Sequence, residues 1–277
     1  MTLCNLARVS ESGYYKWLKA TDSRKVKNEL EILDYQLIKE IFDDQNGTAG
    51  FRTIVMQLLE QHDLIMNHKK VIRIMRKYSL ECKIRRRKSY GNTFNKQRIE
   101  NTYENLLNKT FDCTEPTTVF HTDITYIKYA HGRKTAYLSA VKDEATREIT
   151  AYATSESLEM SFVISTLEGL KKLNIASNAI IHSDQGVHYT SNSYRDKIQE
   201  LGLTGSMSRQ GKCVDNAPIE SFFGHMKDEV NFNKFETYEE VVKVINEYIY
   251  KYNHLRPQWT LKKMTPVKYR NHLLNIA

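Results

Sequence analysis

Of the chain's 277 residues, 40% are hydrophobic and 27% are charged, a composition typical of folded globular proteins that argues against general disorder. Lys and Arg outnumber Asp and Glu by 41 to 33, so the formal net charge is +8, which favours a polyanionic partner such as nucleic acid. The four cysteines form no CxxC pair, no apolar run reaches the roughly 20 residues needed to cross a bilayer, and the start lacks a signal-peptide pattern. We therefore expect a cytoplasmic protein with reduced thiols and no membrane partner.

Residues 1–28 are predicted to form an N-terminal helical arm. Ser10 or Ser12 is a suitable cap for a short helix that carries Tyr14 and Trp17. The pattern suits two structures equally, half of a helix-turn-helix or a hydrophobic arm docked on the rest of the chain.

Residues 29–90 are predicted to form a helix-turn-helix DNA-binding domain of three helices. The first helix is amphipathic and ends at Asn46 and Gly47, the second starts near Phe51, and Asn67 caps the third. One face of the third helix is apolar, and the other face holds cations that we expect to meet DNA phosphates: Lys69, Lys70, Arg73, Arg76 and Lys77. For this segment alone, the alternative is a small helical bundle with a solvated lysine face.

A run of cations at 83–88, with the sequence KIRRRK, favours DNA contact over that alternative. Within it, Arg85, Arg86 and Arg87 are further predicted DNA contacts. From Asn67 to the end of this run, the sequence contains ten Lys or Arg residues and a single acid. This density of positive charge is expected where phosphate charge is neutralised.

Residues 91–110 are polar and predict a linker, and residues 111–235 predict a second domain. Three strand patterns come first, TTVFHTDITYIKY, TAYLSAVKD and EITAYAT, joined by short turns. A helix, the strand AIIHSD, a second helix, a short strand at LTGSMS and a third helix follow. The order βββαβαβα indicates an α/β fold with a mixed five-stranded sheet flanked by helices.

Residues 236–277 are predicted to form a C-terminal helix and a tail packed on that core. Thr237 and Glu240 form a capping box for a long helix that is apolar on most sides. The tail carries Arg256 and Trp259, which suit either base stacking and phosphate binding or simple packing on the domain.

Three acids stand at structurally distinct places in the second domain. Asp123 lies within the first strand, Asp184 ends the fourth strand, and Glu220 lies in the first turn of a helix, 35 residues after Asp184. Unpaired carboxylates are costly among buried apolar residues, and divalent cations compensate them well. Two magnesium ions held about 4 Å apart by such carboxylates promote in-line displacement at phosphorus. Lys227 lies nearly two turns after Glu220 on one stripe of the helix, where its ammonium is predicted to contact phosphate.

Other polar residues near these acids have simpler interpretations. We expect Asp215 to be a turn or capping residue and Asp143 and Glu144 to be solvated in a turn. His121 and His182 each precede a candidate Asp by two residues, hence on the same strand face, and are interpreted as packing or hydrogen-bonding residues. Taken singly, a strand Asp is itself more often a capping or ion-paired residue.

The motifs HTDITYI, HSDQGVHYTS and DNAPIESFFGHMKDE resemble the three blocks of the DDE transposases of the insertion sequence three family, which are similar to retroviral integrases. Upstream, GTAGFRTI followed by NHKKVIRIMRK resembles that family's helix-turn-helix, and the closing YNHLRPQ and MTP also match. The resemblance therefore spans nearly the whole chain.

This resemblance implies an RNase H-like core in which Asp123, Asp184 and Glu220 bind two Mg²⁺ ions, with Mn²⁺ as a substitute. It implies cutting of a DNA strand and transfer of a 3′ hydroxyl to another phosphodiester, with double-stranded transposon ends and target DNA as partners. It also implies a homo-multimer on DNA, located in the bacterial cytosol with the nucleoid.

The chain departs from the family at its front. The family's complete enzyme is usually a frameshift fusion with an upstream helix-turn-helix and a leucine zipper, and no sustained heptad occurs here. Two alternatives therefore stand beside a transposase: a plain nuclease of the same fold, and a DNA-binding regulator or inhibitor of transposition whose core is not active alone.

Overall fold

The structure is a computed structural model that describes residues 4, 7, 9–82, 102–108, 111–209 and 213–276. The chain divides into two compact units, Met1–Ile84 and Arg85–Ala277. The predicted DNA contacts Arg85, Arg86 and Arg87 lie outside the described residues.

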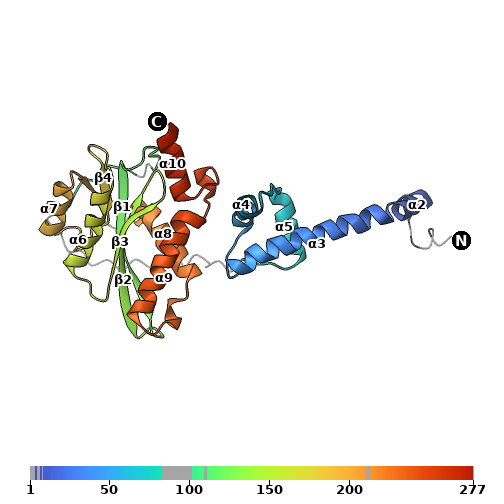
Figure 1. Cartoon of the computed structure of the whole chain (residues 1–277), viewed down its shortest axis with the longest axis horizontal. Coiled ribbons are helices and arrows are strands. Elements are labelled where there is room, and N and C mark those ends of the chain that lie inside the picture. Colours follow the sequence, from blue (N-terminus) through green and yellow to red (C-terminus); the bar gives the residue numbers. More distant parts are fainter. Residues whose placement is uncertain are drawn as a thin grey trace. The chain divides into compact units, whose positions relative to one another are not determined.

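The described part of the first unit is helical. Its elements are α2 (Glu11–Lys19), α3 (Thr21–Asp44), α4 (Phe51–His62) and α5 (His68–Lys77) (Figure 1). The predicted Asn67 cap is confirmed, because its side chain accepts a hydrogen bond from the N–H of Lys69 at 2.9 Å. The first helix of the predicted bundle is longer than expected, since no glycine or proline between Thr21 and Asn28 stops it.

The core of this unit lies where α3, α4 and α5 meet. Its fully buried members include Ile38, Ile54, Leu58, Val71 and Ile74. In contrast, α2 buries no residue, so the arm that it forms is not docked within this unit.

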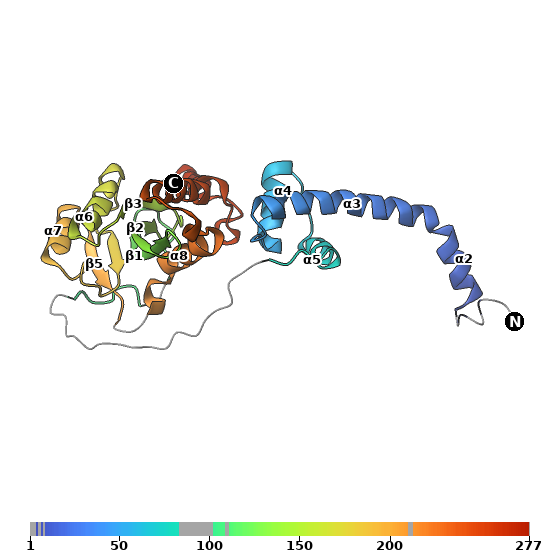
Figure 2. The ribbon, with the colours of Figure 1, turned by 90° about the horizontal axis from the view of Figure 1, so that it is seen from below.

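The second unit is built on a five-stranded mixed sheet with the order β3-β2-β1-β4-β5 (Figures 1 and 2). The strands are β1 (Val119–Tyr129), β2 (Lys134–Asp143), β3 (Ile149–Ser155), β4 (Ile180–Ser183) and β5 (Thr204–Met207). The first three form an antiparallel meander, and β4 and β5 then add in parallel to β1. The predicted mixed sheet is confirmed.

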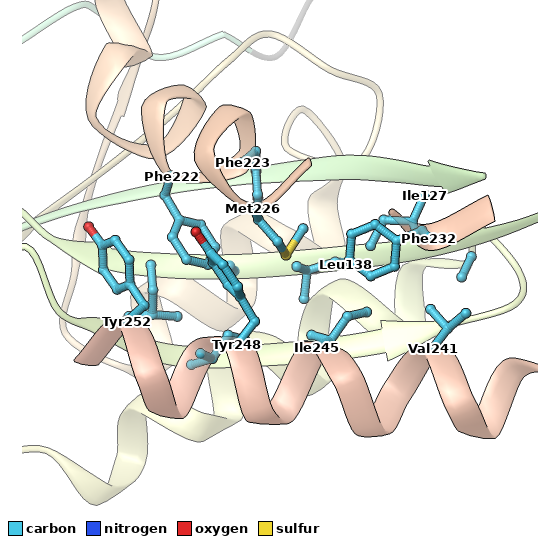
Figure 3. Packing of buried hydrophobic residues seen from close by; sticks show 14 of the residues in the cluster. Ile127, Leu138, Phe222, Phe223, Met226, Phe232, Val241, Ile245, Tyr248 and Tyr252 are labelled. Atoms are coloured by element: carbon cyan, nitrogen blue, oxygen red, sulfur yellow. The ribbon is translucent and has the colours of Figure 1, made fainter. Parts of the chain in front are cut away.

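Helices cover both faces of this sheet (Figure 1). The helices and short helical turns of this unit are α6 (Met160–Glu168), η1 (Gly169–Lys172), α7 (Asn192–Glu200), η2 (Cys213–Asn216), α8 (Ala217–Glu229), η3 (Phe232–Lys234), α9 (Tyr238–Tyr250), η4 (Lys251–Leu255), η5 (Trp259–Leu261) and α10 (Pro266–Ile276). One core packs α6 and α7 on the face that holds Phe120 and Val141. The other packs α8 and α9 on the face that holds Ile127 and Leu138. Figure 3 shows side chains of α8, such as Phe222 and Met226, in this second core.

The C-terminal segment is attached to the sheet by specific bonds. The predicted capping box at Thr237 and Glu240 is confirmed. The amide of Asn253 bonds both the N–H and the carbonyl of Ile149 at 3.0 Å. On α10, Arg270 makes a bidentate ion pair with the largely buried Glu148.

A short segment within the predicted linker packs on the edge of the sheet. The carbonyl of Glu104 accepts a hydrogen bond from the N–H of Met207 in β5, and the ring of Tyr103 lies over Gly205. A Cβ at Gly205 would come within 2.7 Å of that ring, so the glycine admits the close approach. Residues 102–108 are therefore part of the second unit's structure.

Candidate active site

Strand register brings two of the predicted acids together. β1 and β4 run parallel, and His121 pairs with His182 in their ladder. Asp123 and Asp184 each follow one of these histidines by two residues along the strand direction, so both lie on the same face of the sheet as the histidines. Because both strands point the same way, these two acids lie side by side where β4 ends.

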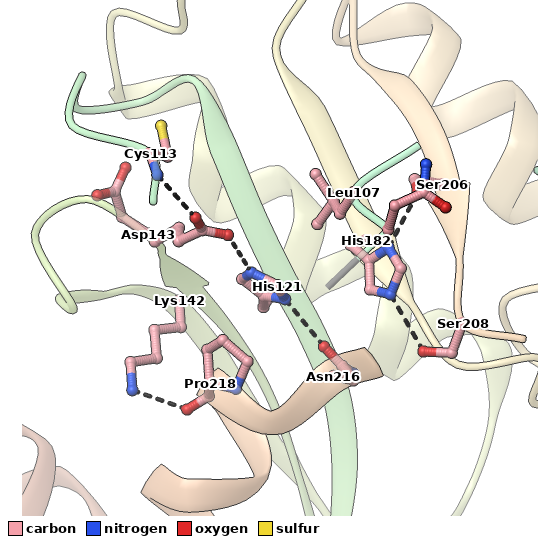
Figure 4. Close-up of polar contacts among 12 residues, drawn as sticks. Leu107, Cys113, His121, Lys142, Asp143, His182, Ser206, Ser208, Asn216 and Pro218 are labelled. Carbon is pink, nitrogen blue, oxygen red and sulfur yellow. Dashed lines mark hydrogen bonds and ion pairs between the residues drawn. The ribbon is translucent and has the colours of Figure 1, made fainter. Parts of the chain in front are cut away.

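Buried hydrogen bonds hold the start of α8 against β1 (Figure 4). The side chain of Asn216 donates to the carbonyl of Thr122 at 3.0 Å, and its oxygen lies 3.1 Å from Nδ1 of His121. Since Glu220 follows four residues later, in the first turn of α8, its carboxylate is brought to the same end of the sheet.

A buried lysine adds a second attachment for the same helix. Lys142 of β2 is 3% exposed, and its Nζ donates to the carbonyl of Pro218 at 2.8 Å. Burial lowers the pKa of Lys142, and the nearby cations Arg147 and Arg256 lower it further, against an opposing effect of Tyr252. The sequence analysis did not identify Lys142, although a lysine within an apolar strand pattern is unusual and was a visible signal.

Burial and neighbouring charges shift the pKa values of the three predicted acids. Burial raises the pKa of Asp123 to about 7, with further increases from Asp184 and then from Glu220, while the N–H of Ile124 and the ammonium of Lys227 oppose the change. Loss of hydration and then the charge of Asp184 raise the pKa of Glu220. Loss of hydration also raises the pKa of Asp184, although its side chain and that of Glu220 stay exposed.

The donor chemistry of this cluster fits a hard divalent cation, because carboxylate oxygens are the ligands that Mg²⁺ prefers. The side chains are not gathered at ligand distance, however: among the described residues, no group of three or more His, Cys, Asp or Glu could hold a metal ion as placed. One oxygen of Asp123 accepts from the N–H of Ile124 at 2.7 Å, and one of Asp184 accepts from Gly186 at 2.9 Å. Binding of one metal ion by all three acids would therefore require their side chains to rotate.

The prediction that Asp143 and Glu144 are solvated is wrong, because both are 2% exposed. Glu144 accepts from Nε2 of His121 and from the N–H of Cys113, whereas Asp143 accepts from Thr117 and Thr146. The turn is therefore buried, and hydrogen bonds from backbone and side-chain donors take the place of water at each carboxylate.

The prediction that the two histidines form hydrogen bonds is confirmed. His121 lies between Glu144 and Asn216, and His182 lies between the hydroxyls of Ser206 and Ser208 at 2.9 and 3.1 Å (Figure 4). Burial, followed by the effect of His121, lowers the pKa of His182 to about 4, so this ring is neutral at pH 7.

Asp215 has a larger role than the turn or cap that we predicted. It is 1% exposed and accepts two hydrogen bonds from the guanidinium of Arg209, one from the N–H of Arg209 and one from the amide of Asn105. It thus joins the segment before α8 to the segment beside β5.

The predicted basic face of α5 divides into two sets. Lys70 pairs with Asp34 of α3, and both Arg73 and Lys77 pair with Glu31. Hydrogen bonds from Lys77 and then Arg73 lower the pKa of Glu31.

The remaining two cations of α5, Lys69 and Arg76, are exposed. They lie on the side of α5 opposite Val71 and Ile74, which face the core. In the second unit, Lys227 is exposed and lies close enough to Asp123 to lower its pKa.

Three family descriptions match consecutive parts of the chain. Residues 27–88 match an HTH-like domain, and residues 114–213 and 220–274 match two descriptions of an integrase core domain. The transposase for insertion sequence element IS904 of Lactococcus lactis is 33% identical, over 82% of this chain and 88% of that protein. The chain belongs to the DDE transposases of the insertion sequence three family.

This transposase also shows weaker similarities. Transposase InsF for insertion sequence IS3A of Escherichia coli is 25% identical, over 97% of this chain and 93% of that protein. The HTLV-2 integrase catalytic core domain in complex with magnesium is 14% identical, with a TM-score of 0.43, over 56% of this chain and 97% of that domain. The family identifies the transposase as an enzyme of the polynucleotidyl transferase type with an RNase H-like core. In the part of the chain that the structure describes, no helix is long and apolar enough to span a membrane.

Proposed function

We propose that this transposase cuts DNA strands at the ends of its insertion sequence and transfers the resulting 3′ hydroxyl to a target phosphodiester, with Asp123, Asp184 and Glu220 as metal ligands. The observation that carries the proposal is the effect of two acids on a third within the fold that brings β1, β4 and α8 together, since Asp184 and Glu220 add to the burial that raises the pKa of Asp123. Three acids this close are destabilised unless a cation neutralises them.

In this proposal the three acids hold two Mg²⁺ ions, with Mn²⁺ as a substitute. When bound, such ions activate the attacking oxygen and stabilise the leaving oxygen of an in-line displacement. The chain's own contribution is to position the carboxylates through Asn216 and Lys142, whose bonds fix α8 against β1 and β2. Lys227 then contacts a DNA phosphate beside the acids.

We further propose that the helical domain, residues 29–90, binds the transposon ends, that 111–235 is the catalytic core, and that 236–277 supports it. In this organisation, residues 1–28 are an N-terminal helical arm and residues 91–110 link the helical domain to the catalytic core. Because two DNA ends must be joined to one target, the active form is proposed to be a homo-multimer, acting in the cytosol on nucleoid DNA.

A strand-transfer assay tests the proposal. The protein is incubated with a labelled DNA fragment from the insertion-sequence end, a supercoiled target plasmid and Mg²⁺. We expect joined products from the wild type and a loss of at least 100-fold with Asp184→Asn. The matched control is Asp196→Asn, which changes an exposed acid of α7 and should leave the products unchanged. Unchanged products from Asp184→Asn would refute the metal-ligand assignment, and cleavage without joining would indicate a plain nuclease.

The second candidate function is a DNA-binding regulator or inhibitor whose core is not active alone. It is favoured by the observation that, within the described residues, no three acids are gathered at metal-ligand distance. In the same assay this protein would retain the end fragment without cutting it, whatever divalent cation is supplied.

A further inference from the structure

A polar groove lies along the open edge of β1 and is lined by Lys227, which follows Glu220 by seven residues on α8. Because β4 pairs with β1 only as far as His121, the edge of β1 beyond that residue is left without a partner strand on this side. The groove has a volume of about 480 Å³, and its floor includes three successive β1 residues, Tyr126, Ile127 and Lys128. Successive strand residues point to opposite faces, so a cavity that touches all three must lie at the strand's edge.

The C-terminal half of α8 and the residues after it form the opposite wall. Lys227, Asn231 and Asn233 line this wall. Along α8, Glu220 and Lys227 are exposed, Gly224 between them is partly exposed, and a Cβ placed on Gly224 would meet no atom within 4 Å. The helix therefore presents no side chain between the carboxylate and the ammonium. Beneath the groove, Ile127 and Phe232 belong to the packed core shown in Figure 3.

The charges of the groove suit a nucleic-acid backbone. Lys128 and Lys227 bring two ammonium groups to it, against one carboxylate, that of Asp228. Lys128 donates one hydrogen bond to Thr135 Oγ1 at 2.7 Å, which holds the ammonium in place and leaves further N–H donors for a phosphate. Glu220 and Lys227 are about 10 Å apart along the helix axis, which corresponds to roughly three nucleotides at ~3.4 Å per nucleotide of one strand.

Tyr126 provides a surface for a base. It is 55% exposed, whereas the other tyrosine of β1, Tyr129, is 1% exposed. The ring is held edge-to-face against Tyr137, with 5.4 Å between the ring centroids. Partly exposed aromatic rings beside lysines are how single-stranded nucleic acids are bound without sequence preference.

We propose that this groove binds the DNA strand that continues from the reacting phosphate, in single-stranded form, with its phosphates on Lys128 and Lys227 and a base stacked on Tyr126. The inference rests on the proposed function, because it takes the acid cluster as the place of reaction. It goes beyond that function by assigning Tyr126 and Lys128, which the chemistry at the acids does not use, and by specifying a frayed rather than a paired DNA end.

Photocrosslinking tests the groove without requiring cleavage. The full chain is bound, in Ca²⁺, to a short duplex whose single-stranded end carries 5-bromodeoxyuridine at one of its first four positions, irradiated, and mapped by mass spectrometry. We expect a crosslink to Tyr126 that peaks near the third position and is lost in Tyr126→Ala. A crosslink confined to other residues, or one that does not depend on position, would overturn the proposal.

Kinetics separate failure of the groove from failure of the proposed function. With end fragments and Mg²⁺, Tyr126→Ala and Lys128→Gln should each raise KM by about tenfold and leave kcat within about twofold, because they weaken strand binding and not the reaction. Tyr126→Phe keeps the ring and should behave as wild type, which excludes a folding defect. The matched controls are Tyr250→Ala and Lys172→Gln, which change exposed residues outside the groove. An inactive wild type would refute the function, whereas an active wild type with unchanged KM in both groove variants would refute only the groove.

Discussion

At the residue scale, the candidate site consists of three carboxyl groups whose ionised forms are disfavoured by loss of hydration and, for Asp123 and Glu220, by neighbouring negative charge. Burial, followed by the charges of Asp184 and Glu220, raises the pKa of the half-buried Asp123 carboxyl to about 7. The folded protein thus binds a proton at Asp123 more tightly than the unfolded chain does, for which the pKa is about 3.9. Stability is therefore lost as pH rises from about 4 to 7, and the full loss persists above pH 7.

We expect Asp123→Asn to stabilise the metal-free protein in a pH-dependent manner. The amide carries no charge, so the free energy of unfolding should rise by about 2 kcal/mol at pH 8 and change little at pH 4. Thermal unfolding in EDTA measures this, with Asp196→Asn as the control. An equal effect at both pH values would contradict the charge explanation.

Asn216 is the second residue with a specific expected effect. Asn216→Ala leaves the carbonyl of Thr122 and one nitrogen of His121 without partners in a buried position, which should cost about 1–3 kcal/mol. Since the same bonds place Glu220, the Mg²⁺ concentration needed for half-maximal cleavage should also rise. Asn246→Ala, on an exposed part of α9, is the control. A loss of stability with no change in the Mg²⁺ requirement would limit Asn216 to a structural role.

At the element scale, α5 shows why a basic helix face is not uniform. Glu31 on α3 pairs with Arg73 and Lys77, so those two cations hold the helices together as well as facing solvent. Lys69 and Arg76 lie on the outer side of the helix. Ion pairs of this partly exposed kind contribute up to about 1 kcal/mol each.

We expect Arg76→Ala and Arg73→Ala to differ. Arg76→Ala should weaken DNA binding at every sequence and reduce the slope of log affinity against log salt by about one, with the free energy of unfolding changed by less than ~0.5 kcal/mol. Arg73→Ala should also lower the stability of the helical unit, because Glu31 loses a partner. Fluorescence anisotropy over a salt series, together with thermal unfolding, checks both. An equal salt slope in Arg76→Ala and wild type would remove Arg76 from the DNA contacts.

At the scale of the whole molecule, the chain consists of two units with separate cores. The core around Ile38 and Leu58 belongs to Met1–Ile84, and the two cores of the sheet belong to Arg85–Ala277. Among the described residues, the members of each of these buried clusters lie within a single unit, which is the property of an independently folding domain.

We expect fragments 1–84 and 102–277 to fold separately. Circular dichroism should show cooperative thermal unfolding of each, since neither loses a core residue on separation. The first fragment alone should bind DNA, and the second should bind Mg²⁺ and retain weak, non-specific nicking. Failure of either fragment to unfold cooperatively would show that the cores depend on each other.

The sequence by itself determined the elements and their order. Alternating β-branched residues, the Asn67 cap and the Thr237 capping box are local signals, because they depend on residues within a few positions of one another. The mixed sheet also followed from the order of the elements, since two strands reached by helical crossovers add in parallel. The identity of the three acids came from motif spacing, and their roles remain predictions.

Only the tertiary structure decided which polar residues are buried and what they contact. Asp143 and Glu144 lie in a turn, where local pattern predicts hydration, yet donors from Thr117 and His121 arrive from other segments and replace the water. Lys142 likewise finds its partner, Pro218, 76 residues away. The physical reason is that burial of a charge is settled by its distant partners, and local sequence carries no record of them.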